Sequence, residues 1–266
     1  MSDAQKILII SPLTPIESSR IKDIVNGHTM LLVLRGFLHN NTMRAISRDV
    51  LNCHDNITTS NYINANLTTL GPYLARYLSN PHEYFSKSQA LESIYPQSLI
   101  DMRANIYETL RRELVLNCLK TAFEPGSGNY SGSIIRFHAD GISNPLHTDN
   151  ILRDGSGSGL AVTAIKHQLS CVVCLQECTQ GGRLRIHQKT WEPSHERFKV
   201  KGELGYREDV ISGSNACDYY PRRGDIYVFN PNHYHQILAV SGTTRITMGF
   251  FLGIVDDDMK KAIAWS

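Results

Sequence analysis

The chain has 266 residues, of which 41% are hydrophobic and 20% are charged, so it can bury a core and is not a disordered tail. Its net charge is only +2, which argues against a dedicated nucleic-acid-binding protein. No run approaches the roughly 18 apolar residues of a membrane helix, and the apolar run at residues 7–10 is too short for a signal peptide. We therefore expect a cytoplasmic protein with a small-molecule substrate and no nucleic-acid or membrane partner; composition sets no oligomeric state.

The first half of the chain is expected to be largely helical. Residues 30–38 read as a strand that ends in a turn, and the polar residues after it offer N-caps for a helix ending near Cys53. Residues 52–66 are polar and irregular, and a second helix is expected over residues 69–78. Residues 98–122 are the strongest helix candidate, because apolar side chains recur there at helical spacing.

After Pro125 the sequence changes to short β-rich runs separated by Gly, Ser and Asn, which is typical of a sandwich or barrel. We expect a mainly β protein with flanking helices, folded as a single domain over residues 1–266. In this division residues 1–125 form helical support and cover a pocket, and residues 126–255 form the core. The expected strands are residues 132–138, 169–176, 182–188, 225–229 and 244–251.

A candidate metal site begins with His147 and Asp149. In an extended segment residues two apart project to the same face, so these two side chains can reach one ion. The segment GDIYVFNPNHYHQI supplies a further histidine, either His235 or His233, which share a face in a regular strand. We favour His235 because it begins the next β-like run. Two histidines and one carboxylate suit Fe(II) and leave further coordination positions open for substrate chemistry.

Arg245 lies ten positions after His235, in a strand whose other residues are apolar enough to be buried. A buried guanidinium requires a partner, and a carboxylate co-substrate held by the planar fork would provide one. Thr247 shares a face with Arg245 and can add a hydroxyl donor. Further candidate substrate contacts are Arg136, His138 and Tyr130, of which the first two share parity just before the metal segment.

These motifs resemble those of the Fe(II)/2-oxoglutarate-dependent oxygenases that have a double-stranded β-helix (jelly-roll, cupin-like) core. The resemblance covers residues 130–253. Within it, QLSCVVCLQECTQGGRLRIHQKTW and PRRGDIYVFNPNHYHQILAVSGTTRITMGFFLG look like the small-molecule branch. That branch contains natural-product hydroxylases and the related carrier-independent aliphatic halogenases.

The resemblance implies a role for each matching residue. His147, Asp149 and His235 would be the iron ligands, Arg245 would bind the distal carboxylate of 2-oxoglutarate, and Thr247 would assist it. With O2, the enzyme would oxidise an unactivated C–H bond of a small molecule and release succinate and CO2. The substrate expected by analogy is a free amino acid or a natural-product intermediate, and the oxidation is hydroxylation, desaturation or cyclisation.

Asp149 separates hydroxylation from halogenation within this resemblance. Halogenases of this type carry Gly or Ala at the carboxylate position, which opens a site for chloride, so Asp149 disfavours that activity. Outside the oxygenases, a cupin-like metal-binding protein or isomerase would share the scaffold, but it would not need Arg245. A zinc hydrolase would more often show an HExxH motif, which the sequence lacks.

Overall fold

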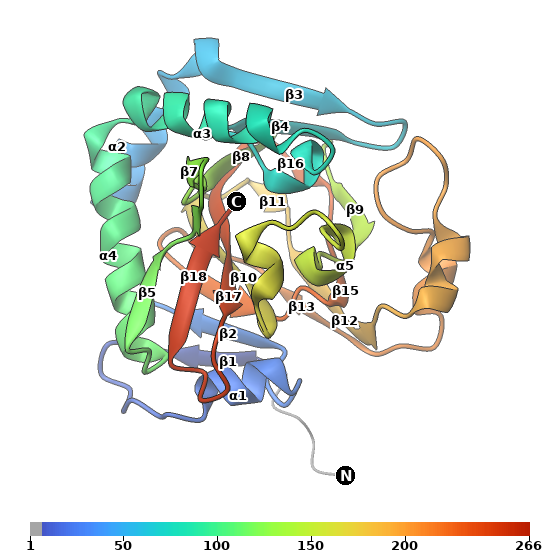
Figure 1. Ribbon diagram of the computed structural model, residues 1–266. Coiled ribbons are helices and arrows are strands. Elements are labelled where there is room, and N and C mark those ends of the chain that lie inside the picture. The colour runs from blue at the N-terminus through green and yellow to red at the C-terminus, as the bar shows by residue number, and fades with distance from the viewer. Residues whose placement is uncertain (1–6) are drawn as a thin grey trace.

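The computed structural model describes residues 7–266, and its largest element is a ten-stranded sheet (Figure 1). The sheet brings together strands from both halves of the chain. Its middle strand, β17 (Arg245–Ile254), pairs antiparallel with β10 (His167–Gln176) and with β8 (Ile134–His138). The other strands are β1 (Ile7–Ile10), β2 (Leu31–Leu34), β3 (Ile57–Asn61), β4 (Asn66–Leu70), β5 (Cys118–Thr121), β14 (Ile226–Phe229) and β18 (Lys261–Trp265).

A second sheet of four strands carries the candidate metal site. In hydrogen-bonded order its strands are β13 (Ala216–Tyr219), β12 (Leu184–Thr190), β15 (His233–Ile237) and β9 (Asn144–His147). Together with the run β14-β10-β17-β8 of the large sheet, these strands form two antiparallel layers of four, which is the arrangement of a jelly roll. The predicted fold class, mainly β with flanking helices and a jelly-roll core, is confirmed. Two short ribbons pair β6 (Phe123–Glu124) with β7 (Gly128–Asn129) and β11 (Gln180–Gly181) with β16 (Val240–Ser241).

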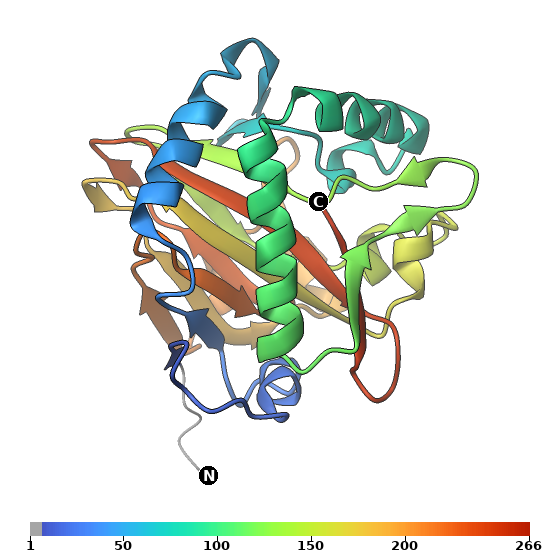
Figure 2. The same cartoon turned by 90° about the vertical axis from the view of Figure 1, so that its left-hand side faces the viewer.

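Two helices cover the face of the large sheet that lies away from the small one. Figure 2 shows α2 (Asn40–Leu51) and α4 (Gln97–Glu113) crossing in front of its strands. Their buried apolar side chains join those of β10 and β17 in the main hydrophobic core. Among the described residues no helix has the length and apolarity needed to cross a bilayer. The remaining helices are α1 (Arg20–Val25), α3 (Pro81–Ile94) and α5 (Ile151–Asp154), with 3₁₀ turns η1 (His54–Asn56), η2 (Leu74–Tyr77), η3 (Ala161–Ala164), η4 (Pro193–Phe198) and η5 (Glu208–Ile211).

The helix predicted over residues 69–78 is wrong. Thr69 and Leu70 end strand β4, which pairs with β8, and only the 3₁₀ turn η2 follows. Pairing with a neighbouring strand outweighs the weak helical pattern, and β-branched threonine favours the extended form. Gly71, at a φ of +107°, and Pro72 then break the chain direction.

The helix predicted over residues 98–122 begins where expected but ends early, at Glu113. Val115 adopts a positive φ of 54°, a conformation that stops a right-handed helix and is costly for a β-branched residue. Residues Cys118–Thr121 then form β5, which pairs in parallel with the C-terminal strand β18. That strand lies nearly 150 residues away in sequence, so local periodicity does not reveal the pairing.

The first half of the chain also contributes more β-structure than its sequence pattern indicates. The segment expected to be irregular, residues 52–66, contains β3, which pairs with β4 in a hairpin at the edge of the large sheet. This hairpin lies across the top of the molecule in Figure 1. The division into support over residues 1–125 and core over 126–255 stays a prediction.

The packing of α4 on the sheet predicts a measurable contribution to stability. Leu110 is fully buried in the main core, so Leu110→Ala should lower the free energy of unfolding by about 2–5 kcal/mol in denaturant titrations. The control Asn105→Ala alters an exposed position of the same helix and should change stability by no more than about 0.5 kcal/mol. Equal effects of the two substitutions would contradict this packing.

Candidate metal centre

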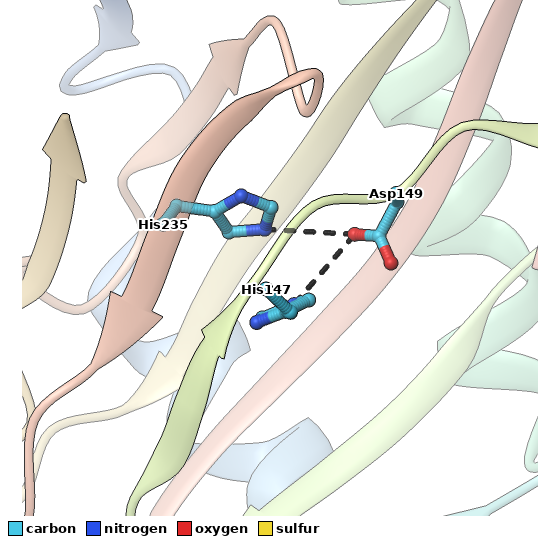
Figure 3. Close-up of side chains that lie close together, drawn as sticks. All are labelled: His147, Asp149 and His235. Atoms are coloured by element: carbon cyan, nitrogen blue, oxygen red, sulfur yellow. Dashed lines mark ion pairs between the residues drawn. The ribbon is translucent and has the colours of Figure 1, made fainter. Parts of the chain in front are cut away.

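The small sheet places two histidines opposite each other. Strands β9 and β15 run antiparallel, and His147 is the direct cross-strand partner of His235. The centroids of the two imidazole rings lie 4.2 Å apart. Asp149 follows the end of β9, and its Oδ2 lies 3.7 Å from Nε2 of His147 and 3.5 Å from Nε2 of His235 (Figure 3).

Backbone carbonyls fix the orientation and tautomer of both imidazoles. Nδ1 of His147 donates to the carbonyl of Pro145 at 2.7 Å, and Nδ1 of His235 donates to that of His233 at 2.8 Å. Because a carbonyl only accepts, each Nδ1 must carry the proton, which leaves the Nε2 lone pair free. Metal-ligating histidines are commonly held in this way. Both free lone pairs lie on the side of Asp149 (Figure 3).

The electrostatics of the three residues favour the protonation states that a metal requires. Burial, together with the neighbouring His235, lowers the pKa of His147 to about 4, so this ring is neutral at physiological pH. Burial alone would raise the pKa of Asp149, but His147, His235 and Arg136 outweigh it and hold that pKa well below its usual range. The cluster therefore offers two imidazole nitrogens and one carboxylate, with ligand atoms all within 4.8 Å of one another. This donor set fits a divalent ion such as Fe(II).

Arg245 lies on the adjacent large sheet and is almost completely buried, at 3% exposure. Its Nη2 donates to the hydroxyl of Tyr227 at 2.8 Å, while its Nε has no hydrogen-bond partner among the described residues. No carboxylate within salt-bridge distance neutralises it in the described part of the chain. Thr247, on the same face of β17, is also buried. An incomplete set of partners around a buried cation fits an anionic ligand that completes it.

One cavity of about 320 Å³ connects these groups. It is lined by His147, Asp149 and His235 from the small sheet, and by Arg245 and Thr247 from the large one. A space of this size accommodates a small co-substrate and part of a second small molecule. The jelly roll therefore places the predicted metal ligands and the predicted carboxylate-binding residues in one cavity.

The structure places two of the three candidate substrate contacts in the cavity and the third outside it. Arg136 and His138 on β8 both line the cavity, as their shared parity predicts. His138 is buried and its Nδ1 has no partner in the described chain; burial and the nearby Arg245 and Arg136 hold its pKa well below the usual range. Tyr130 does not line the cavity.

Tyr130 and His233 have other surroundings. Tyr130 packs edge-on against Phe85 and donates a hydrogen bond to Glu124, in a satellite hydrophobic cluster. His233, the alternative metal ligand, hydrogen-bonds through Nδ1 to the carbonyl of His187 at 3.1 Å and lies outside the ligand cluster. The structure thus groups His235, and not His233, with the HxD segment.

Sequence reasoning missed several cavity residues. Tyr227 hydrogen-bonds to Arg245 and lines the cavity from β14, together with Phe229. Its hydroxyl group, in an otherwise apolar strand, was the sequence signal that could have identified it. Asn144 begins β9, with its Nδ2 at 3.5 Å from Nε2 of His147. Tyr73 and Arg76 enter from the segment predicted as helix, so no pattern placed them at the site.

Comparison with known proteins identifies the family. The family model described as "Carrier-protein-independent halogenase WelO5" matches residues 13–266, nearly the whole chain. The chain belongs to this family. Within it, the chain carries Asp149 at the position where a halogenase of this type is expected to have Gly or Ala.

Individual relatives are more distant. A curated protein of Purpureocillium lilacinum, "Leucinostatins biosynthesis cluster protein S", is 28% identical over 141 residues; the match covers 51% of this chain and 56% of that protein, so the chain spans about half its length. A solved N-substituted L-amino acid dioxygenase from Burkholderia ambifaria AMMD has a TM-score of 0.60 at 14% identity, covering 94% of this chain and 92% of that one. The carbocyclase SnoK from nogalamycin biosynthesis has a TM-score of 0.52 at 12% identity, with 89% and 86% coverage. Both structures support the jelly-roll fold.

The geometry predicts that His235, and not His233, is required for metal binding. His235→Ala should weaken Co(II) binding, measured anaerobically by calorimetry. Loss of a residue that only hydrogen-bonds to a metal ligand weakens metal binding by roughly 10–100-fold, so loss of the ligand itself should weaken it by more. His233→Ala is the matched control, because it keeps the backbone carbonyl that holds His235 and should bind Co(II) nearly as wild type does. The reverse order of affinities would refute the assignment.

Proposed function

We propose that this protein is an Fe(II)/2-oxoglutarate-dependent dioxygenase that hydroxylates an unactivated C–H bond of a small molecule. The observation that carries the proposal is the combination of a two-histidine, one-carboxylate cluster with the buried, incompletely partnered Arg245 in one cavity. A cupin-like protein that only binds a metal has no use for such an arginine. Membership of an oxidative halogenase family supports the same chemistry.

Each residue has a defined task in this proposal. His147, Asp149 and His235 would hold Fe(II) on one side and leave the side toward the cavity open. Arg245 would bind the distal carboxylate of 2-oxoglutarate through its fork, with Tyr227 fixing the guanidinium and Thr247 adding a hydroxyl. The bound iron and co-substrate supply the activation of O2, with release of succinate and CO2. The buried lining limits the access of water to this chemistry.

Asp149 favours hydroxylation over halogenation, although halogenation names the family. A halogenase needs a coordination position for chloride, and a carboxylate ligand occupies that position. Asp149 lies close to both histidines and is held as an anion by them and by Arg136, so it is suited to bind the ion directly. Desaturation and cyclisation need the same ligands and remain alternatives to hydroxylation at this site.

The substrate is expected to be a free amino acid or a natural-product intermediate. The names of the Burkholderia dioxygenase and of the leucinostatin cluster protein support this class for the present chain. A cytoplasmic location and the absence of nucleic-acid partners stay predictions.

The role of Arg245 predicts a specific loss of co-substrate binding. A 2-oxo acid that chelates Fe(II) gives a visible charge-transfer band, which can be titrated anaerobically. Arg245→Met should weaken 2-oxoglutarate binding by at least tenfold, because a charge-assisted bidentate contact contributes roughly 1.5–3 kcal/mol. The control Arg44→Met removes an exposed arginine of α2 and should bind as wild type does. Absence of the band from folded, iron-loaded wild-type protein would refute the proposed function.

The role of Asp149 predicts how the site responds to chloride. In the wild-type protein loaded with Fe(II) and 2-oxoglutarate, added chloride should leave the charge-transfer band unchanged, because Asp149 fills the ligand position. In Asp149→Gly at saturating iron, the band should become dependent on chloride. A chloride-dependent band in the wild-type protein would show that Asp149 is not a ligand and would favour halogenase activity.

A further inference from the structure

Arg136 is a second arginine of the active-site cavity, and the metal and co-substrate leave it without a counter-ion. Its side chain rises from β8 into the cavity that also holds the metal ligands. Within residues 7–266 it makes no hydrogen bond and no ion pair. Its side chain is only partly exposed; this burial lowers its pKa, and the attraction of Asp149 offsets only part of the effect. A guanidinium in this state is costly unless a ligand completes its contacts.

The position of the Arg136 fork separates it from the site assigned to 2-oxoglutarate. Arg136 pairs across the sheet with Thr247, but its Nη1 lies over Gly249, where an added Cβ would overlap it. Gly249 follows Thr247 on β17, on the side away from Arg245. The two guanidinium groups therefore serve different parts of the cavity. Glycine at position 249 provides the space in which the Arg136 fork rests.

The charge of the cavity also indicates that Arg136 lacks a counter-ion. Three arginine side chains, those of Arg76, Arg136 and Arg245, line it with one acidic side chain, that of Asp149, so the lining side chains carry a formal charge of +2 with the histidines neutral. Fe(II) and doubly charged 2-oxoglutarate neutralise each other, so loading the site leaves this excess unchanged. The loaded cavity thus keeps an excess of positively charged side chains, which favours the binding of a further anion.

The rest of the lining indicates what kind of anion fits. Much of the cavity lining is apolar, with side chains from both sheets and from the loop before Gly205. Polar lining is concentrated at the metal and at the arginines. A molecule with an acid group at one end and an aliphatic or aromatic body matches this division. The larger aliphatic and aromatic lining residues are Leu67, Val172, Leu184, Leu204, Phe229, Ile237, Phe250 and Phe251.

We propose that Arg136 forms a second carboxylate subsite, and that the substrate is a small amphipathic carboxylic acid whose acid group binds there. This inference rests on the proposed function, because it assigns Arg245 to the co-substrate. Arg136 would bind the acid group through its fork and so set which carbon of the aliphatic body faces the metal. Arg76, which is exposed and donates to Ser60, would attract the acid at the entrance.

The test compares acids with their neutral analogues on anaerobic wild-type protein loaded with Fe(II) and 2-oxoglutarate. The probes are N-acetyl-L-leucine, N-acetyl-L-phenylalanine and 4-methylpentanoate, each beside its carboxamide. Each pair differs in charge but hardly in size. Perturbation of the charge-transfer band should report binding of at least one acid, at least tenfold tighter than its carboxamide. If no acid binds, or if the carboxamides bind equally well, the inference is wrong even though the band itself has established co-substrate binding.

Variants then assign the contact to Arg136. Arg136→Met should weaken acid binding by at least tenfold, leave carboxamide binding unchanged, and change 2-oxoglutarate affinity by less than about threefold. Arg136→Lys should recover only part of the acid binding, because it keeps the charge and loses the fork. Gly249→Ala should weaken acid binding by displacing the guanidinium. Arg44→Met should bind acids as wild type does.

Two further measurements distinguish a substrate-binding role of Arg136 from a role in co-substrate binding or in the stability of the fold. If Arg136→Met weakens 2-oxoglutarate as strongly as it weakens the acids, Arg136 belongs to the co-substrate site and the inference is overturned. Without ligand, Arg136→Met should unfold at the same temperature as wild type or higher, because it removes an uncompensated cation. A lower melting temperature would show that Arg136 supports the fold and not a ligand. The acid and carboxamide comparison on wild-type protein needs no variant to fold.

Discussion

The cross-strand pairing of β9 with β15 is the constraint on which the site depends. This register sets His147 directly opposite His235, and a shift of one residue would turn each ring to the other face of the sheet. Two backbone carbonyls then fix the tautomers, so that both free nitrogens lie toward Asp149. The large sheet closes the cavity from the other side and contributes Arg245 and Arg136. The chemistry thus arises from side chains that two rigid layers hold in place.

The cavity combines a family-typical framework with an unusual set of charges. The chain belongs to a halogenase family, yet Asp149 lies beside the two histidines, where we propose that it takes the coordination position that halogenation would leave to chloride. Three arginines face one acidic residue, and this excess outlasts the pairing of iron with 2-oxoglutarate. The attraction of Asp149 offsets only part of the effect of burial on the pKa of Arg136. This excess of positive charge is the basis on which Arg136 is proposed to bind an anionic substrate.

The sequence predicted the site better than it predicted the first half of the fold. His147 and Asp149 follow from the two-residue period of an extended chain, and a buried arginine such as Arg245 stands out by its type alone. Preferring His235 to His233 required a judgement about which residue lies on firmer backbone, and the structure places His235 in the cluster. Residues 69–78 and 115–121 were misjudged because their conformation depends on pairing with β8 and β18, and long-range pairing leaves no local periodicity. Arg76 was missed for the same reason, whereas Tyr227 lies in a correctly predicted strand and was missed although its hydroxyl was a local signal.

The central claim is that Asp149 binds the iron in a chain that belongs to a halogenase family. A crystal structure of the anaerobic complex with Fe(II), 2-oxoglutarate and chloride tests it most directly. The account predicts one metal bonded to Nε2 of His147, Nε2 of His235 and a carboxylate oxygen of Asp149, with the distal carboxylate of 2-oxoglutarate on Arg245. A chloride ion bonded to the metal with Asp149 turned away, or a metal bound elsewhere, would contradict it.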